Sequence, residues 1–251
     1  MVIEERRWWF RTLLVLFDDE AALVNATSKR GSHIEAMSYN DLTLPQFSLT
    51  QEKKAGIIDL SGSLDEVLAS FNTTAQKKIS RTMRYEGFRF EAYDWPFPPE
   101  GYELYAAFER ERGNVPFPLI RLRSCRLFLG YDQNAPVSGA FVYPTIPIAR
   151  ARSFFSRRRS VSDHEAYKRV SLASNRIIFE ICRWAKESDR SGFDLGSVNT
   201  TEESKAGITN FKLSFNPRLV PEYTYSYSSP FYTVLENAIA AMRRVRRSFL
   251  H

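Results

Sequence analysis

A carboxylate and a histidine stand where this sequence could place reactive groups. Asp194 lies in a short apolar run just before Gly196, and a carboxylate at a strand end sits at a sheet edge, where α/β proteins usually bind ligands. His164, between Asp163 and Glu165, belongs to the chain's one acid–histidine cluster and could accept a proton near neutral pH. Plainer interpretations stay open, because Asp194 could cap the following loop and a lone loop histidine is usually solvated.

A helix, a strand and a second helix are predicted to position Asp194. The first helix is expected to begin among three cap-type residues, Ser171, Ser174 and Asn175. Its apolar face recurs at helical spacing, through Ile177, Ile178, Ile181, Trp184 and Ala185. Gly192 suits the end of this helix, Phe193–Leu195 then forms a strand, and Gly207–Ser214 forms the second helix.

These same residues carry a resemblance to a known family. The run 175–186, then Phe193-Asp194-Leu195-Gly196, then Gly207-Ile208 and Phe211-Lys212 with Phe215 resembles the last part of acyltransferases with the GNAT fold. The most similar branch is the Fem-type group of peptidoglycan-bridge aminoacyltransferases and polysaccharide-biosynthesis acetyltransferases. The resemblance implies an α/β fold with a mixed, mostly antiparallel central sheet flanked by helices, here with an N-terminal β-hairpin extension.

The resemblance also implies an activity. It is N-acyl transfer from an acyl-CoA, a carrier or an aminoacyl-tRNA to an amine acceptor, which could be a small molecule or a cell-envelope precursor. Lys212, from the Phe-Lys pair, would neutralise a phosphate or support the developing oxyanion. Asp194 would hold the acceptor amine or orient Lys212. A surface lysine on a helix whose Phe211 and Phe215 pack inward is the alternative for Lys212.

The donor site implied by the resemblance lies at the start of the 171–187 helix. Backbone amides there would bind the pyrophosphate of coenzyme A, near Ser171, Ser174, Asn175 and Arg176. The chain lacks the glycine-rich loop of ordinary GNAT proteins at this point, so a Fem-like donor or a degenerate site stays open. Helix capping alone is the plainer role. Pro144 and Pro147 mark a place where strand pairing could end and admit the donor.

Three cations share one face of a predicted helix that begins at Ser63. Lys77, Arg81 and Arg84 are spaced to bind phosphate or a nucleic-acid backbone, or to form a solvated basic face. Arginines also gather at 157–159 and in an amphipathic C-terminal helix, where tRNA, an acyl-carrier protein or anionic lipid could bind. Two further functions therefore stay open: a non-catalytic GNAT-like binding module, and a nucleic-acid or membrane-surface binding protein.

Composition narrows these possibilities only slightly. The 251 residues carry 43% hydrophobic residues, a net charge of +6 and two cysteines, Cys125 and Cys182, without metal-ligand spacing. We therefore expect no metal, reduced thiols and a cytoplasmic protein. The apolar run 8–17 is interrupted by Arg11 and followed by acidic residues, so neither a signal peptide nor a transmembrane span is expected.

The sequence predicts three divisions of the chain. Residues 1–54 form an N-terminal hairpin, with strands at 8–17 and 21–26, followed by an irregular stretch. Residues 55–232 form the acyltransferase core, with central strands at 126–131, 137–143 and 148–155. Residues 233–251 form the basic C-terminal helix.

Overall fold

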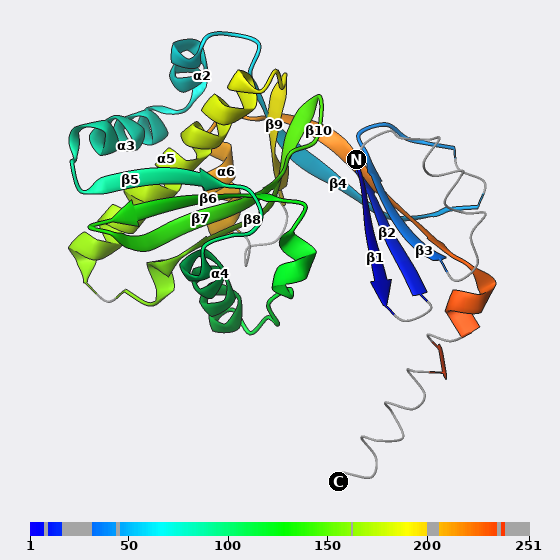
Figure 1. The fold of residues 1–251 in the computed structure, drawn as a ribbon. Coiled ribbons are helices and arrows are strands. Elements are labelled where there is room, and N and C mark those ends of the chain that lie inside the picture. Colours follow the sequence, from blue (N-terminus) through cyan, green and yellow to red (C-terminus); the bar gives the residue numbers. More distant parts are fainter. Residues whose placement is uncertain are drawn as a thin grey trace. The chain divides into compact units, whose positions relative to one another are not determined.

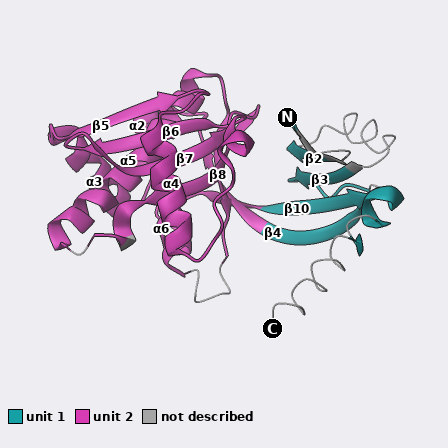
Figure 2. Ribbon diagram, turned by 60° about the horizontal axis from the view of Figure 1, so that its bottom comes forward, with its two compact units in different colours: residues 1–53, 221–251 teal, residues 54–220 magenta. Residues whose placement is uncertain are grey.

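The computed structural model divides the chain into two compact units (Figure 2). The described residues are 1–7, 10–16, 32–43, 46–161, 163–199, 206–234 and 237–238. One unit holds residues 54–220, and the other holds residues 1–53 together with 221–251. No helix among the described residues is both long enough and apolar enough to cross a lipid bilayer.

The larger unit is a sheet with helices on both faces (Figure 1). Its strands are the end of β4 (Ser48–Asp59), β5 (Phe88–Tyr93), β6 (Arg126–Asp132), β7 (Ala135–Tyr143), β8 (Ile148–Ser156) and β9 (Gly192–Ser197). Their order in the sheet is β4-β9-β8-β7-β6-β5, and every neighbouring pair is antiparallel except β8 and β9, which are parallel. The predicted mixed, mostly antiparallel sheet is confirmed.

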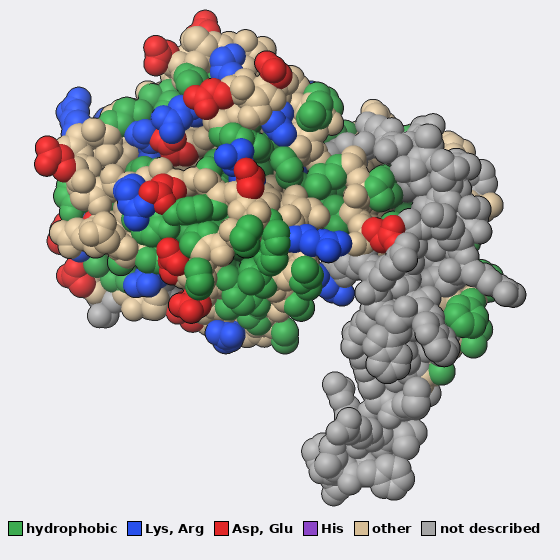
Figure 3. Space-filling view, viewed as in Figure 1, with side chains coloured by type: hydrophobic (Ala, Val, Ile, Leu, Met, Phe, Trp, Pro, Cys, Tyr) green, Lys and Arg blue, Asp and Glu red, His purple; other side chains and the backbone are tan. Residues whose placement is uncertain are grey.

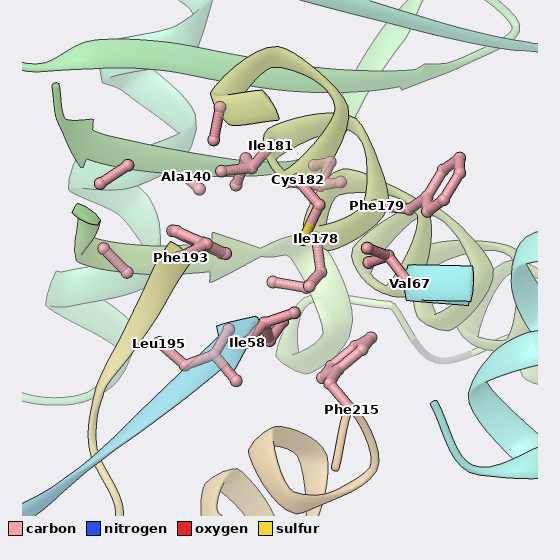
Figure 4. Close-up of a cluster of buried hydrophobic side chains, with 14 of the residues drawn as sticks. Ile58, Val67, Ala140, Ile178, Phe179, Ile181, Cys182, Phe193, Leu195 and Phe215 are labelled. Carbon is pink, nitrogen blue, oxygen red and sulfur yellow. The ribbon is translucent and has the colours of Figure 1, made fainter. Parts of the chain in front are cut away.

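The described residues of this unit also form five helices and two 3-10 turns. They are α2 (Leu64–Ser70), α3 (Thr73–Arg84), α4 (Pro99–Glu111), η1 (Leu119–Leu122), η2 (Arg157–Arg159), α5 (His164–Glu187) and α6 (Ala206–Leu213). α5 packs on one face of the sheet, where Ile178, Ile181 and Cys182 are fully buried among the residues of Figure 4. α4 covers the other face, where the Tyr105 ring lies 5.4 Å from Phe141 and 5.6 Å from Phe155.

Strand alternation explains how one sheet serves both helices. Neighbouring residues of a strand point to opposite faces, so Ala140 of β7 packs in the α5 cluster while Phe141 meets Tyr105 of α4. Both residues are 0% exposed. A buried aliphatic or aromatic side chain contributes about 1.5–3 kcal/mol, so these two layers hold the central strands in place.

The single helix predicted to run on from Ser63 is wrong. Ser63 caps α2 as expected, and its side chain forms a capping box with Glu66. The helix then ends at Ser70 with Phe71 as its C-cap, and the Asn72 side chain accepts a hydrogen bond from Ala75 N at 2.8 Å to start α3. An N-cap residue in extended conformation interrupts a helix because it satisfies the free amides of the next one.

The smaller unit corrects the predicted N-terminal region. β1 (Val2–Arg7) and β2 (Phe10–Leu16) form the antiparallel hairpin, whereas the strand predicted at 21–26 lies outside the described residues. The stretch predicted to be irregular contains β3 (Ser32–Ser38) and most of β4. β3 pairs with β2 and with β10 (Arg218–Ser228). The core of the smaller unit is formed by Leu13, Val15, Ile34, Ala36 and Tyr225.

The two compact units therefore differ from the predicted division. Their first boundary, after Lys53, lies close to the predicted one after residue 54, but the segment from Pro221 onward joins the N-terminal strands. The reason is the pairing of β10 with β3, from Tyr223↔Ser38 to Ser228↔His33. The predicted C-terminal helix at 233–251 lies almost entirely outside the described residues.

Candidate functional site

The candidate site lies where β8 and β9 separate in the middle of the larger unit's sheet. The two strands pair at only three positions, and the last of them joins Arg150 to Asp194. Beyond that point β9 follows β4 instead, with Ala55 opposite Ser197 and with Val198 N donating to Lys54 O at 2.7 Å. The backbone of β8 after Arg150 therefore has a partner in β7 but none in β9.

A β-bulge in each strand explains the separation. In β8 the register against β7 shifts at Arg152, which has no partner between Ala151 and Ser153. In β9 the register against β4 shifts between Asp194 and Ser197, where Gly196 has a φ of 76°. A bulge bends its strand, and a left-handed residue within it is most easily a glycine. The two bends open the sheet at one point.

Asp194 is held at this point by a buried ion pair. The residue is 0% exposed, one of its carboxylate oxygens accepts a hydrogen bond from the Arg150 guanidinium, and the other accepts from Gly196 N at 2.6 Å. Arg150 is 6% exposed. Asp194 lies at the last pair of the β8–β9 ladder, but it is the third of six residues in β9, so the prediction of a strand-end carboxylate is wrong. The strand continues past Gly196 to Ser197.

Lys212 reaches the same stretch of β9 from α6. Its ammonium group donates a hydrogen bond to the carbonyl of Ser197 at 2.7 Å. A β-carbon built onto Gly196 would lie 3.6 Å from Lys212 Nζ and 3.8 Å from the Ala151 carbonyl oxygen. The structure thus brings Asp194 and Lys212 to the two sides of Gly196, beside the opening of the sheet. Phe211 and Phe215 pack inward as expected, with ring centroids 5.2 Å apart.

His164 does not join this group. It is the first residue of α5 and is exposed, and β8 runs six residues beyond Arg150, about 20 Å, before η2 and α5 begin. Its acidic neighbours have other partners: the Asp163 carboxylate accepts from Ala166 N at 2.7 Å, and Glu165 pairs with Lys168 at 2.7 Å. These hydrogen bonds lower the pKa of both carboxyl groups.

The prediction that a helix begins near Ser171 is wrong, because α5 already begins at His164 with Asp163 as its N-cap. Residues 164–170 contain no glycine or proline, so nothing interrupts the helix before Ser171. Asn175 is buried and donates to the Ser171 carbonyl at 2.8 Å, while Ser174 donates to the Val170 carbonyl at 2.8 Å. The amides of these residues belong to the helix interior and are not free for a pyrophosphate.

Arg176 and the cations of α3 have different environments. Arg176 forms an ion pair with the buried Glu180. Lys77, Arg81 and Arg84 are exposed on one side of α3, opposite its buried residues. Their neighbour Lys78 is half-buried and donates to Ser171 Oγ at 3.2 Å, and burial lowers the pKa of its ammonium group. The three cations thus form an exposed basic face on α3.

Three buried thiol and phenol groups of the larger unit stay uncharged near neutral pH. Burial raises the pKa of the Cys125 thiol to about 12 and that of the Tyr143 phenol to about 12. Burial also raises the pKa of Cys182. Across the described ranges no group of three or more His, Cys, Asp or Glu side chains could hold a metal ion.

Sequence reasoning missed two features of the site. Arg150 and Arg152 break an otherwise apolar strand at alternate positions, which could have indicated a charged partner on one face of the sheet. The parallel pairing that brings Arg150 to Asp194 spans 44 residues and has no local signal. Pro144 and Pro147 were proposed to mark a place where strand pairing ends. They lie in the turn of the β7–β8 hairpin, and the β7–β8 pair next to this turn is Tyr143↔Arg150.

Comparisons with known proteins support the fold. No family model and no curated protein sequence matches this chain. Among solved structures, FemX is similar with a TM-score of 0.61 and 12% identity, over 95% of this chain and 86% of that one. This chain has the fold of FemX. The GNAT-type fold of the Fem branch, predicted from the sequence, is thereby confirmed.

Two further structures share this fold. One is the C-terminal domain of a putative lysylphosphatidylglycerol synthetase from Agrobacterium fabrum, with a TM-score of 0.54 and 14% identity over 96% of this chain and 83% of that one. The other is L-PGS from Bacillus licheniformis, with a TM-score of 0.53 and 13% identity over 93% and 82%. Identities this low establish the fold alone.

Proposed function

We propose that this chain is an acyltransferase that moves an aminoacyl or acyl group from an activated donor to an amine. The observation that carries this proposal is the opening between β8 and β9, with Lys212 beside it. An extended donor could form backbone hydrogen bonds with the strand edges that separate after Arg150 and Asp194. A donor held in this way presents its carbonyl to an acceptor in a fixed orientation.

The proposed transfer forms one bond, breaks one bond and moves one proton. The acceptor nitrogen forms a bond to the donor carbonyl carbon, the bond to the leaving oxygen or sulfur breaks, and the acceptor's proton passes to the leaving group. Lys212 supplies positive charge toward the oxyanion that forms on the carbonyl oxygen. The Arg150–Asp194 ion pair fixes the strand end that carries Gly196 and Ser197, and so positions the Lys212 ammonium.

An aminoacyl ester, as carried by aminoacyl-tRNA, is the donor we favour over a coenzyme A thioester. The first turn of α5 holds the carboxylates of Asp163 and Glu165, and Asp163 caps the helix with its own side chain. A negative charge in that position disfavours a pyrophosphate, which would need the same amides. A tRNA donor would place the reaction in the cytoplasm.

For the acceptor we propose a chemical class, and for the tRNA we propose a contact surface. FemX and the C-terminal domain of the lysylphosphatidylglycerol synthetase share the fold, and lysylphosphatidylglycerol is by its name an aminoacyl lipid. This supports an acceptor from the cell envelope ahead of a soluble metabolite, whereas the amine of the acceptor is proposed from the Fem-type resemblance of the sequence. The exposed cations Lys77, Arg81 and Arg84 are the proposed contact with the tRNA backbone.

The test is transfer by the purified chain from labelled aminoacyl-tRNA, and separately from labelled acetyl-CoA, to a panel of amines and amine-bearing envelope precursors. Lys212→Met should reduce kcat by about 10²–10³-fold, the usual effect of removing one oxyanion donor. Lys186→Met is the matched control, because Lys186 also donates to a backbone carbonyl, that of Leu60 at 3.1 Å, but lies on α5. It should retain the wild-type kcat.

Three outcomes contradict the proposal in different ways. Equal losses in the Lys212 and Lys186 variants would assign Lys212 to stability alone. Transfer from acetyl-CoA but not from aminoacyl-tRNA would overturn the choice of donor. Binding of tRNA without transfer to any amine would favour a non-catalytic binding module.

A further inference from the structure

A short segment between α4 and β6 exposes several large apolar side chains. Val115 is 91% exposed, Ile120 is 56% exposed and Phe117 is 37% exposed. They fall within eleven residues, from Gly113 to Arg123. Exposed apolar residues scattered singly need no explanation, whereas a group of them commonly marks an interaction surface.

This segment is held in place by the core beneath it. Phe117 N donates to the Tyr105 hydroxyl at 3.2 Å, and the Tyr102 hydroxyl donates to the Phe117 carbonyl at 3.0 Å. Tyr105 is only 2% exposed, and Pro116 and Pro118 each fix a backbone φ angle. The apolar side chains are thus presented by an anchored backbone, not by a loose loop.

Arginines surround these apolar side chains. The Arg152 guanidinium lies 4.2 Å from the Phe117 ring centroid. Arg112 and Arg123 are exposed at the two ends of the segment. The nearby carboxylate of Glu109 accepts a hydrogen bond from Asn114 at 2.7 Å and lies 3.9 Å from the Arg112 guanidinium, which is half-exposed. Figure 3 shows hydrophobic side chains gathered around α4, with Lys and Arg side chains beside them.

We propose that residues 112–123 dock this unit onto an anionic lipid surface. The combination of projecting apolar side chains and flanking arginines suits the boundary between anionic headgroups and acyl chains. Val115 projects almost entirely into solvent, and lipid can accept such a tip without a matching pocket. A protein partner would need a cavity of complementary shape for each projecting side chain.

The docking segment is joined directly to the candidate site. Arg152, which stacks on Phe117, is the bulge residue of β8 and stands two positions after Arg150. Docking through this segment would bring the opening between β8 and β9 toward a membrane-bound acceptor. The proposal does not depend on the acyltransferase function, because lipid binding can be measured without any turnover.

The test is sedimentation of the full chain with vesicles of phosphatidylcholine alone or mixed with phosphatidylglycerol. The wild type should bind the anionic vesicles, more weakly as salt rises. The double variant Val115→Ser/Ile120→Ser should lose at least about tenfold in partitioning. Arg112→Gln and Arg123→Gln should each lose about fivefold. Thermal unfolding of each variant checks that the fold is retained.

Met83→Ser is the matched control. Met83 is 51% exposed between Arg81 and Arg84 on α3, so it presents an apolar side chain among arginines elsewhere on the same unit. Its substitution should leave vesicle binding unchanged. Absence of wild-type binding to anionic vesicles would overturn the proposal, and so would binding that survives the double substitution or falls equally in Met83→Ser.

Discussion

The two edges of β8 behave differently, and the contrast locates the candidate site. Along one edge β8 pairs with β7 at six positions, from Ser156↔Ser138 to Arg150↔Tyr143. Along the other edge it pairs with β9 at three positions and then stops. The β7 edge is an ordinary antiparallel hairpin filled with aromatic rings, whereas the β9 edge ends at a buried ion pair and a glycine with positive φ.

This difference indicates which part of the strand supports the fold and which part is free to serve a ligand. Unpaired backbone in the middle of a sheet costs free energy, because buried amides and carbonyls need partners. A protein keeps such a defect only where other contacts compensate for it, and strand bulges commonly occur beside active sites. The contrast predicts that substitutions on the β7 edge affect stability alone, while those on the β9 edge also affect transfer.

The largest effect is expected where the β8–β9 ladder ends. Arg150→Met leaves the Asp194 carboxylate buried without its ion-pair partner, so the free energy of unfolding should fall by about 3–5 kcal/mol. Urea unfolding measures this change. The double variant Arg150→Met/Asp194→Leu should recover much of the loss, because no buried charge is left unpaired.

The double variant also separates stability from function. If the ion pair positions the strand end for Lys212, the double variant should fold but transfer more slowly than the wild type. Wild-type transfer in a folded double variant would show that the pair contributes to the fold alone. It would contradict the prediction that substitutions on the β9 edge also affect transfer.

Two glycines offer an intermediate test of the two edges. A β-carbon at Gly139 of β7 would overlap the Phe155 ring and lie 3.0 Å from Leu129 Cδ2, so Gly139→Ala should cost about 1–3 kcal/mol by overpacking. A β-carbon at Gly196 meets only the Lys212 ammonium and the Ala151 carbonyl, both beyond 3.5 Å. Gly196→Ala should cost about 1–2 kcal/mol from its φ of 76° alone.

Transfer kinetics should rank these two glycine variants in the opposite order. Gly196→Ala alters the backbone between Asp194 and Lys212, so kcat should fall by more than it does in Gly139→Ala, even though its expected loss of stability is no larger. Thermal unfolding and steady-state assays on the same preparations give both rankings. A parallel ranking in the two measurements would remove the distinction between the two edges of β8.

The sequence predicted most of the elements around the site because their apolar patterns are local. The alternation in β6, β7 and β8 and the helical spacing of Ile177, Ile181 and Ala185 each point to one burial pattern. The start of α5 was misplaced because residues 164–169 are mostly polar and charged, so no apolar stripe marks the first turns of the helix. The first part of β4 was missed because its seven successive residues from Ser48 to Lys54 are exposed. β3 was missed although Ile34 and Ala36 are buried on either side of the exposed Glu35.

The site itself was less predictable than the elements. Asp194 and Lys212 could be proposed from the sequence, and the structure places both beside Gly196. The Arg150 partner and the separation of β8 from β9 depend on a parallel register between strands that are joined through α5. The residues next to Arg150 and Asp194 in the sequence do not indicate this register, because it depends on how α5 packs across the sheet.

The smallest effect is expected at Ser153, just beyond the bulge in β8. Its hydroxyl oxygen is buried and has no hydrogen-bond partner among the described residues. Ser153→Ala removes an unpaired polar group, so stability should stay unchanged or rise by up to about 1 kcal/mol. If the hydroxyl instead serves a donor bound in the opening, KM for that donor should rise in the variant while the unfolding midpoint does not fall. A stability loss above about 1 kcal/mol would mean that the hydroxyl is already paired within the fold and is not available to a donor.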